Sequence, residues 1–558
     1  MEYIVFSAVI LACLFFIFML GMLEERRTKK RFREKLKKDY GKPSNKQYAE
    51  GRLSTISGYY RKTMGESDFS IDDITWNDLD MDRLYQSMDY TFSAAGEEVL
   101  YKTLRCPSME EESLKKREEK IEYFRKNQEK RINMQLLFAS IGRTGKYSIV
   151  DYIDYLNVLK EEKLTKHIAV LASMGISLAA MLFSPALGLV AFCALLAGNI
   201  MMYFPSQKLI APYITTFAYL LRMIGSIEKL EKCGISVFSE EMDALRELKK
   251  KTNAFAKGSF LVFGDRVAKS NPLEILLDYI KMCFHIDILK FYSMLKEAKK
   301  HRADFLAMFE IIGSMEVVIS IGAFRESLSY ACLPEFDEHL CVQGEELYHP
   351  LIENPVVNSF REEKGMLLTG SNASGKSTFL KTVAINVILA QTIHTCMAKS
   401  FTCSMFRVYS SMSLRDDLAA KESYFIVEIK ALKRVIDAVQ KEGAPVLCFV
   451  DEVLRGTNTV ERIAASTEIL ESLLGEKSMC FAATHDIELT RLLEGKYHNY
   501  HFEETISEDD VKFNYKLKEG RATTRNAIRL LGILQYEKQI IDKAEKRAEH
   551  FIETGKWV

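Results

Sequence analysis

Residues 168–204 form a run of thirty-seven residues without a single charged side chain. Such a run must be buried in a protein core or inserted in a membrane, because apolar surface is unfavourable in water. Ser184 and Pro185 lie near its middle, where a small polar residue followed by proline predicts a turn. Each half then has about 17 residues, the lower limit for a membrane-spanning helix. The run therefore predicts a helical hairpin.

Three features favour a membrane hairpin over a hairpin buried in a soluble core. The run has no charge, Gly175, Gly188 and Gly198 would allow close contact between its helices, and polar segments flank it on both sides. The soluble alternative stays open, because short apolar helices also occur in protein cores. A membrane hairpin would return residues 24–166 and 205–558 to the same side.

Residues 3–23 form a second uncharged run, long enough to cross about 30 Å of hydrocarbon as a helix. A cleaved signal peptide fits less well, since no basic region precedes the run and no A-x-A site follows it. The basic flank that follows predicts that the N-terminus lies outside and that the catalytic part lies in the cytoplasm. Together with the two helices of the hairpin, this run predicts a multi-pass membrane protein with three spans. This flank can contact anionic lipid headgroups or, alternatively, nucleic acid. Its cations are Arg26, Arg27, Lys29, Lys30, Arg31, Arg33, Lys35, Lys37 and Lys38.

Overall charge does not indicate the partner, because 76 Lys and Arg balance 76 Asp and Glu. The eleven cysteines are scattered without a CxxC pair, which argues against a disulfide framework or a zinc site. The length of 558 residues allows several domains.

The chain divides into a helical part and a part with alternating strands and helices. Charged stretches with apolar residues at helical spacing cover residues 72–160 and 207–335, so one helical domain is interrupted by the hairpin. The turn-rich stretch 348–359 marks the change to α/β patterning. The expected domains are a membrane anchor (1–23), a basic juxtamembrane linker (24–71), a helical domain (72–167 and 205–339) split by the hairpin (168–204), an α/β domain (340–545) and a tail (546–558).

A phosphate-binding loop follows the first apolar strand of the α/β part. The sequence GSNASGKST satisfies GxxxxGK[ST] between a predicted strand and a predicted helix. Glycines let backbone amides surround phosphate, Lys376 can reach the terminal phosphates, and Ser377 can hold Mg²⁺. The residues expected to bind ATP are Gly370, Ser371, Asn372, Ala373, Ser374, Gly375, Lys376, Ser377 and Thr378.

Two later strands end in polar residues that suit phosphate chemistry. Asp451 and Glu452 follow the apolar run PVLCFV, so Asp451 is expected to hold Mg²⁺ and Glu452 to polarise the attacking water. His485 follows the next strand and is expected to contact the γ-phosphate. The combination predicts an ATP hydrolase.

Four motifs occur in order within residues 340–545: GSNASGKSTFLKT, ESYFIVEI, FVDEVLRGTNTVE and FAATHDIEL. Together they resemble the ATPase domain of the MutS family, DNA mismatch-repair proteins among the ABC-type ATPases. The resemblance extends upstream to the family's helical core and lever domain. The start of that domain is similar to MDYTFSAAGEEVLYKTLRCPSMEEESLKKREEKIEYF, and its end is similar to FLAMFEIIGSMEVVISIGAF and YHPLI. The implied fold class is α plus α/β: a helical core and lever domain with transmembrane helices, followed by a P-loop ABC-type ATPase domain.

The resemblance also implies roles for matching residues. Asn372 matches the family's loop asparagine, and His485 matches its switch histidine. Ser423 matches the signature serine that contacts the γ-phosphate bound by the opposite subunit, and residues 456–459 match a loop that crosses the dimer interface. The implied assembly is a homodimer with composite sites, which ATP binding closes and hydrolysis reopens.

Departures from the family pattern limit what can be transferred. Ser371 replaces the usual proline, and the segment 519–533 lacks the family's Ser-Tyr-Gly turn. We find neither the mismatch-reading domain with its Phe-x-Glu wedge nor a recognisable clamp, and the apolar hairpin lies where the clamp is expected. Recognition of mismatches is therefore not expected, although DNA is a candidate partner.

Three hypotheses follow for function. The first is a membrane-anchored dimeric ATPase that acts on DNA near the membrane. The second is a solute transporter, which is disfavoured because no LSGGQ-like signature and no ionisable residue within the spans is present. The third is a mechanical ATPase that moves a membrane partner without DNA.

Overall fold

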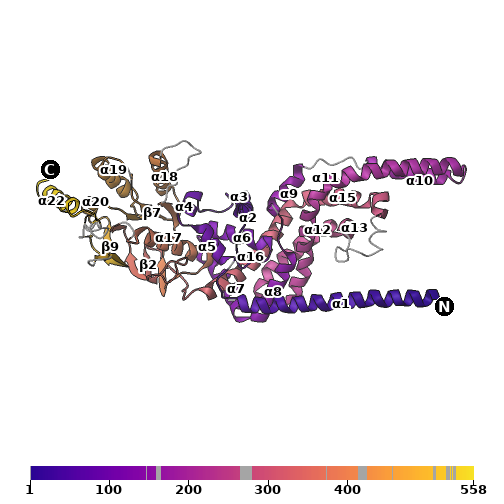
Figure 1. Ribbon diagram of the computed structural model, residues 1–558, viewed down its shortest axis with the longest axis horizontal. Coiled ribbons are helices and arrows are strands. Elements are labelled where there is room, and N and C mark those ends of the chain that lie inside the picture. Colours follow the sequence, from indigo (N-terminus) through magenta and orange to yellow (C-terminus); the bar gives the residue numbers. More distant parts are fainter. Residues whose placement is uncertain are drawn as a thin grey trace.

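The protein is mostly helical, and two small mixed sheets lie in its C-terminal half (Figure 1). The types of secondary structure therefore confirm the predicted combination of a helical part and an α/β part. The computed structural model describes residues 2–44, 46–145, 147–158, 165–263, 279–371, 374–412, 424–454, 457–506, 511–522, 528, 531 and 536–557.

Up to residue 327, all regular elements of the described chain are helices. In α5, Met81, Leu84, Tyr85 and Met88 recur at helical spacing and are all buried, which explains why this segment folds as a helix against the core. The elements are α1 (Glu2–Asp39), α2 (Arg52–Ile56), α3 (Gly58–Thr63), α4 (Asp73–Asp78), α5 (Met81–Met88), α6 (Ala94–Arg105), α7 (Glu111–Lys126), α8 (Gln128–Ile141), α9 (Ile149–Val158), α10 (Thr165–Ala180), α11 (Pro185–Cys233), η1 (Ser236–Phe238), α12 (Ser239–Ala256), α13 (Phe260–Phe263), α15 (Ile286–Lys300) and α16 (Arg302–Ser327).

The α/β part contains a six-stranded sheet in the order β10-β9-β4-β8-β7-β6 and a four-stranded sheet in the order β1-β5-β2-β3. In the larger sheet, β9, β4, β8, β7 and β6 pair in parallel, and β10 pairs with β9 in antiparallel. The strands are β1 (Glu335–Phe336), β2 (Val342–Leu347), β3 (Asn358–Glu362), β4 (Met366–Thr369), β5 (Ser400–Cys403), β6 (Arg407–Ser411), β7 (Val446–Asp451), β8 (Ser478–Ala483), β9 (His498–Ile506) and β10 (Val511–Glu519). The helices are α17 (Lys376–Ile393), α18 (Tyr424–Val439), α19 (Thr459–Ser472), α20 (Ile487–Leu492) and α22 (Lys538–Thr554).

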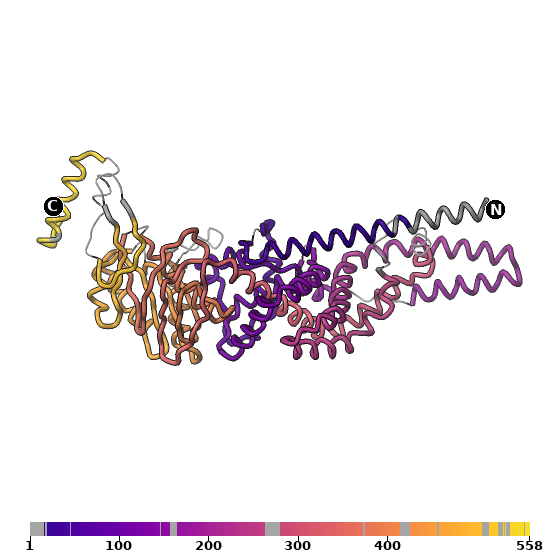
Figure 2. Tube along the Cα trace, turned by 90° about the horizontal axis from the view of Figure 1, so that it is seen from below, coloured from indigo at the N-terminus to yellow at the C-terminus, as the bar shows by residue number. Residues whose placement is uncertain are grey.

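The predicted hairpin is present, with one correction to its extent. Helices α10 and α11 are joined by residues 181–184, so the turn lies at Ser184 and Pro185 as predicted. However, α11 does not end near residue 204; it continues as one helix of 49 residues to Cys233, because apolar residues such as Phe217 and Leu220 keep packing into the helical core. Figures 1 and 2 show the hairpin and α1 projecting from the helical part in the same direction, away from the sheets.

The three hairpin glycines differ in their surroundings. A Cβ at Gly188 would lie 2.7 Å from the Met181 nitrogen, so glycine is needed where α11 passes the turn. A Cβ at Gly175 or Gly198 would meet nothing within 4 Å. The prediction of close helix contact therefore holds at Gly188 and is wrong at the other two positions.

Within the described residues, two helices are long and apolar enough to cross a membrane, α11 and α16. The apolar window of α16 is 72% buried, as in a core helix, whereas that of α11 is only 17% buried. Helix α10 is apolar but has only 16 residues. Most side chains of the predicted span 3–23 lie outside the described residues. The structure therefore does not support three spans.

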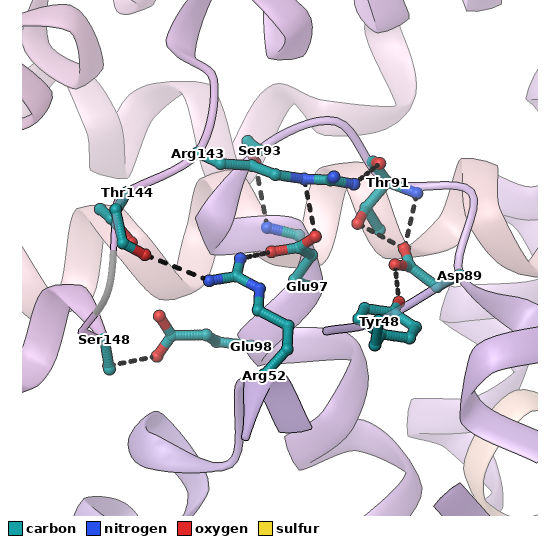
Figure 3. Close-up of polar contacts among 12 residues, drawn as sticks. Tyr48, Arg52, Asp89, Thr91, Ser93, Glu97, Glu98, Arg143, Thr144 and Ser148 are labelled. Atoms are coloured by element: carbon teal, nitrogen blue, oxygen red, sulfur yellow. Dashed lines mark hydrogen bonds and ion pairs between the residues drawn. The ribbon is translucent and has the colours of Figure 1, made fainter. Parts of the chain in front are cut away.

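The segment expected to be a linker packs onto the helical part (Figure 3). Arg52 and Arg143 form ion pairs with Glu97 at the start of α6, and the latter contact measures 2.6 Å. Lys46 lies 2.7 Å from the buried carboxylate of Asp89. Hydrogen bonds and ion pairs thus tie the chain after α1 to the helical core.

Glu98, beside this cluster, is fully buried and accepts a hydrogen bond of 2.6 Å from the Ser148 hydroxyl (Figure 3). Burial raises the pKa of Glu98 from 4.5 to about 8, although the Ser148 hydrogen bond partly opposes this. The folded state therefore keeps a proton that the unfolded state loses, and the free energy of unfolding should fall between about pH 5 and pH 8, by at most about 1.4 kcal/mol per pH unit.

We expect Glu98→Gln to remove this part of the pH dependence and to stabilise the protein at pH 8. The measurement is urea unfolding of the parent and the variant at pH 5.5 and pH 8. Glu119→Gln, at an exposed carboxylate of α7, is the control and should keep the parent's pH dependence. Equal pH dependence in all three proteins would contradict the prediction.

The helical part and the α/β part meet at a buried ion pair. The Arg325 guanidinium at the end of α16 donates to both carboxylate oxygens of Glu118 in α7, at 2.6 and 2.8 Å. It also donates to the Thr395 hydroxyl at 2.8 Å and to the His394 carbonyl at 3.3 Å, just after α17. Burial alone would raise the pKa of Glu118, but hydrogen bonds from Arg325 and His394 outweigh it and lower the pKa to about 2.

Candidate functional site

The candidate site lies at the carboxyl ends of three adjacent parallel strands. Strand β4 leads into the predicted phosphate loop, β8 leads to His485, and β7 ends at Asp451. All residues of β4 and β8 are buried, which fixes the positions of the polar residues that follow. Ligands of open parallel sheets commonly bind at this edge.

The loop between β4 and α17 needs glycine at two positions. Gly370 has φ 145°, and a Cβ there would lie 2.9 Å from the Phe502 carbonyl oxygen. Gly375 has φ 104° and precedes the first turn of α17. The loop therefore approaches β9 closely and presents the N-terminus of α17 to the site, where backbone amides favour an anion.

Lys376 is buried at the start of α17. Its ammonium group donates to the carbonyl oxygens of Gly370 at 2.8 Å and Ser371 at 2.9 Å, and lies 3.4 Å from His485 Nε2. Ser371 in turn donates a hydrogen bond of 3.0 Å to Glu504 in β9. The lysine is held at the loop, at the position from which it could contact phosphate.

Glu452 and His485 form a contact that the sequence did not predict. His485 Nε2 lies 2.9 Å from Glu452 Oε1, and the Glu452 amide donates to the Ala483 carbonyl at 2.9 Å. Glu452 adopts φ 57°, an unusual conformation for a residue with a side chain, which functional sites often contain. Lys376, Glu452 and His485 thus lie together, although they come from three separate strand ends.

A cavity of about 1050 Å³ opens beside these residues. Ser371, Ser374, Gly375, Lys376, Ser377, Thr378, Asp451 and Glu452 line it, so most of the expected binding and metal residues that are described share one space, whereas Gly370 and His485 are not among the lining residues. Asn372, Ala373, Ser423 and Gly456 lie outside the described residues. Thr457 and Asn458 are described, and the Asn458 side chain caps α19 by accepting from the Val460 amide at 3.0 Å.

Sequence reasoning missed part of the cavity wall. Residues 352–356, interpreted only as part of a turn-rich boundary, line the cavity together with His349, Phe502 and Tyr515. Burial lowers the pKa of His349 to about 4, with a smaller contribution from the charge of Lys381. The sequence signal for this part of the wall was the proline and the apolar residues of the boundary, because a solvent-exposed linker does not need such residues.

The helical part also reaches the cavity. Asp80, between α4 and α5, lines it and lies 3.3 Å from the ammonium group of Lys381 in α17. Nearby, Asp78 accepts hydrogen bonds from the Ser410 hydroxyl at 2.7 Å and the Met412 amide at 2.9 Å, at the end of β6. A displacement of α17, which follows the loop, or of the end of β6 would therefore act directly on the helical part.

The residues fit a magnesium nucleotide. Ser374 Oγ is buried and has no hydrogen-bond partner among the described residues, as expected of a group that faces a phosphate. Ser377 supplies a hydroxyl and Asp451 a carboxylate to the same cavity, the oxygen ligands that Mg²⁺ prefers. The volume is ample for a nucleotide, since ligand cavities commonly measure about 300 to 1,000 Å³.

Comparisons with known proteins found similarity to one family. Residues 366–552 match the family model of MutS domain V. The chain is 28% identical to the DNA mismatch repair protein MutS of Leptospira interrogans over 308 residues, 52% of this chain and 36% of that protein. It is 29% identical to MutS protein homolog 4 of Mus musculus over 266 residues, 44% of this chain and 27% of that protein. It is also 29% identical to the DNA mismatch repair protein MutS of Thermotoga sp. (strain RQ2) over 266 residues, 46% of this chain and 33% of that protein. The chain thus spans about a third of the length of the curated relatives it matches.

Proposed function

Because the chain belongs to the MutS family through its domain V, we propose that it is an ATPase that hydrolyses ATP in the cavity at the ends of β4, β7 and β8. The observation that carries the proposal is the meeting of Lys376, Glu452 and His485 beside a glycine-containing phosphate loop. Each of these residues has a distinct part in phosphoryl transfer.

The proposed reaction is attack of water on the γ-phosphate, which forms a bond from the water oxygen to phosphorus and breaks the bond to the bridging oxygen, so that ADP leaves with that oxygen. Glu452 accepts a proton from the water as it attacks, and His485, in contact with Glu452, orients that carboxylate and donates to the phosphate. Lys376 exchanges its loop carbonyl partners for phosphate oxygens. Mg²⁺, held by Ser377 and Asp451, would neutralise charge on the phosphates.

We further propose that the ATPase domain forms a homodimer. In this arrangement Ser423 contacts the nucleotide bound by the opposite subunit, and ATP binding closes the interface. Within one subunit, the contact of Asp80 with Lys381 and those of Asp78 with the end of β6 connect the site to the helical part. Closure would therefore move the helical levers.

Attachment to a membrane is the next part of the proposal. Helix α1 joins the apolar segment 3–23 to a basic segment, which predicts an anchor with its basic end in the cytoplasm. The hairpin projects in the same direction as α1 (Figures 1 and 2). The ATPase domain lies at the opposite end of the molecule, where it is accessible from the cytoplasm.

A second candidate function is action on DNA, because two of the relatives are DNA mismatch repair proteins by name. In this case DNA should stimulate ATP hydrolysis, and stimulation should weaken steeply with salt, since phosphate contacts release counterions. A purely mechanical ATPase that moves a membrane partner should not respond to DNA.

The test is ATP hydrolysis by the full chain in lipid nanodiscs, with and without duplex DNA at low and moderate salt. We expect hydrolysis by the parent and its loss in Lys376→Ala, because the phosphates would lose their buried cation. Lys399→Ala, which removes an exposed lysine paired with Glu346, is the matched control and should keep the parent's rate. Equal rates in the parent and Lys376→Ala would place the activity elsewhere, and a rate unaffected by DNA at either salt would reject the second candidate.

A further inference from the structure

The hairpin formed by α10, residues 181–184 and the start of α11 presents many apolar side chains to its surroundings. Leu182 and Phe183 in the turn are 85% and 91% exposed, and further exposed residues follow along both arms. These are Ile168, Ile176, Leu178, Leu187, Leu189, Val190, Met201 and Phe204. A surface of this kind is unfavourable in water and needs an apolar environment.

We propose that this hairpin enters the hydrocarbon interior of a lipid bilayer from the side of the ATPase domain and that its turn remains inside, without emerging on the far side. The proposal rests on the membrane attachment proposed above and replaces two spans by one re-entrant element. It follows from the length of the arms, the chemistry of the turn and the polar groups at the base.

The α10 arm is too short to cross a bilayer. Helix α10 has 16 residues, a length of about 24 Å at 1.5 Å per residue. Its charge-free part begins after Lys166 and His167, so only about 20 Å separates this level from the turn. The hydrocarbon interior measures about 30 Å. The turn should therefore lie beyond the middle of the bilayer but short of the opposite headgroups.

The turn is built to remain in hydrocarbon. The amides of Met181, Leu182, Phe183 and Ser184 donate to carbonyl oxygens of residues 178–180, at 2.9 to 3.2 Å, and the Gly188 amide donates to Ser184 at 2.9 Å. Proline at position 185 has no amide hydrogen. These donors would cost several kcal/mol each if left without a partner in lipid. A turn that emerged into water would need neither this pairing nor two exposed apolar side chains.

Polar groups close the base of the hairpin at one level. Asn199 donates to the Cys283 carbonyl at 2.7 Å, Tyr203 donates to the Asp287 carboxylate at 2.8 Å, and His167 Nδ1 lies 2.7 Å from His285 Nδ1. We call these side chains, Asn199, Tyr203, His167, His285 and Asp287, the polar collar; all are buried. On α11, Asn199 lies about 21 Å from the helix start at Pro185.

The two arms thus reach His167 and Asn199 at about the same depth, about 20 Å from the turn, and Tyr203 lies about one helical turn further along α11. Lys166 and Lys208 are exposed on the side of the collar nearer the cytoplasmic domains, where the positive-inside rule places cations. Helix α1 extends in the same direction as the hairpin, so both elements can enter one membrane (Figures 1 and 2). A bilayer interior therefore accounts for the apolar arms, the paired turn and the polar base together.

The test is labelling of a single added cysteine by a membrane-impermeant maleimide in cells that express the full chain. Ser184→Cys and Leu182→Cys place the thiol in the turn, and Tyr155→Cys, at an exposed position of α9, is the cytoplasmic control. Labelling of the parent, which has its own cysteines, is subtracted. We expect the control to be labelled once the cells are permeabilised, and both turn variants to be labelled only after denaturation in detergent.

Two other results would overturn the proposal. Labelling of the turn in intact cells would show that the hairpin spans the membrane. Labelling of the turn after permeabilisation, at the rate of Tyr155→Cys, would show that it lies in the cytoplasm and covers another protein. Carbonate extraction of the same membranes and ATP hydrolysis by the same preparations report separately on membrane attachment and on the proposed activity.

Discussion

Glu452→Gln should lower the turnover number for ATP by about a hundredfold or more, because removal of a general base typically costs that factor. Glutamine has nearly the same shape but cannot accept a proton from water at neutral pH. ATP affinity should stay close to that of the parent, since Lys376 and the loop between β4 and α17 are unchanged. The measurements are steady-state hydrolysis and equilibrium binding of a fluorescent ATP analogue.

Glu494→Gln provides the matched control, because Glu494 is an exposed carboxylate paired with Arg521 outside the cavity. It should hydrolyse ATP at the parent's rate. Parental turnover in Glu452→Gln would show that another group activates the water, and loss of both binding and turnover would show that Glu452 supports the architecture of the site instead.

Arg325→Met should destabilise the protein by about 3 to 5 kcal/mol, since it leaves the buried carboxylate of Glu118 without its cation. The variant also removes donors to Thr395 and His394, so the helical and α/β parts should separate more readily. The measurement is urea unfolding at pH 7, with limited proteolysis to detect separation of the two parts.

Arg246→Met is the control for loss of an arginine in general. Arg246 forms ion pairs with Glu231 and Asp243, but its side chain is half exposed, so water can replace the lost contacts. Its unfolding midpoint should stay near that of the parent. Equal shifts in the two variants would contradict a special role for the junction.

Local patterns predicted which residues come together at the candidate site. The spacing of glycines, Lys376 and Ser377 depends on a short segment of chain, and Asp451, Glu452 and His485 each follow a strand whose apolar residues are recognisable. Parallel strands then bring their ends to one edge, so Gly375, Lys376, Ser377, Asp451 and Glu452 line one cavity, and His485 contacts Glu452 beside it. The contact between Glu452 and His485 could not be predicted, because it depends on the strand order β4-β8-β7.

Contacts between distant segments were beyond sequence reasoning. Asp80 and residues 352–356 line the same cavity although about 270 residues separate them. Similarly, the segment after α1 looked like a polar linker, yet Lys46 and Arg52 pair with carboxylates that come from later parts of the chain. The local sequence around a charged residue does not indicate whether its side chain is solvated by water or paired with a buried carboxylate.

The sequence by itself determined the helical and α/β halves, the phosphate loop and the position of the hairpin turn, because each depends on residues close together in the chain. Only the tertiary structure decided how far the hairpin reaches. Helix α11 continues to Cys233, and the polar collar joins its Asn199 and Tyr203 to residues more than eighty positions away. The apolar run alone has the length of two minimal spans, but α10 supplies only about 20 Å of charge-free helix before the turn, and packed polar groups begin at Asn199 on α11.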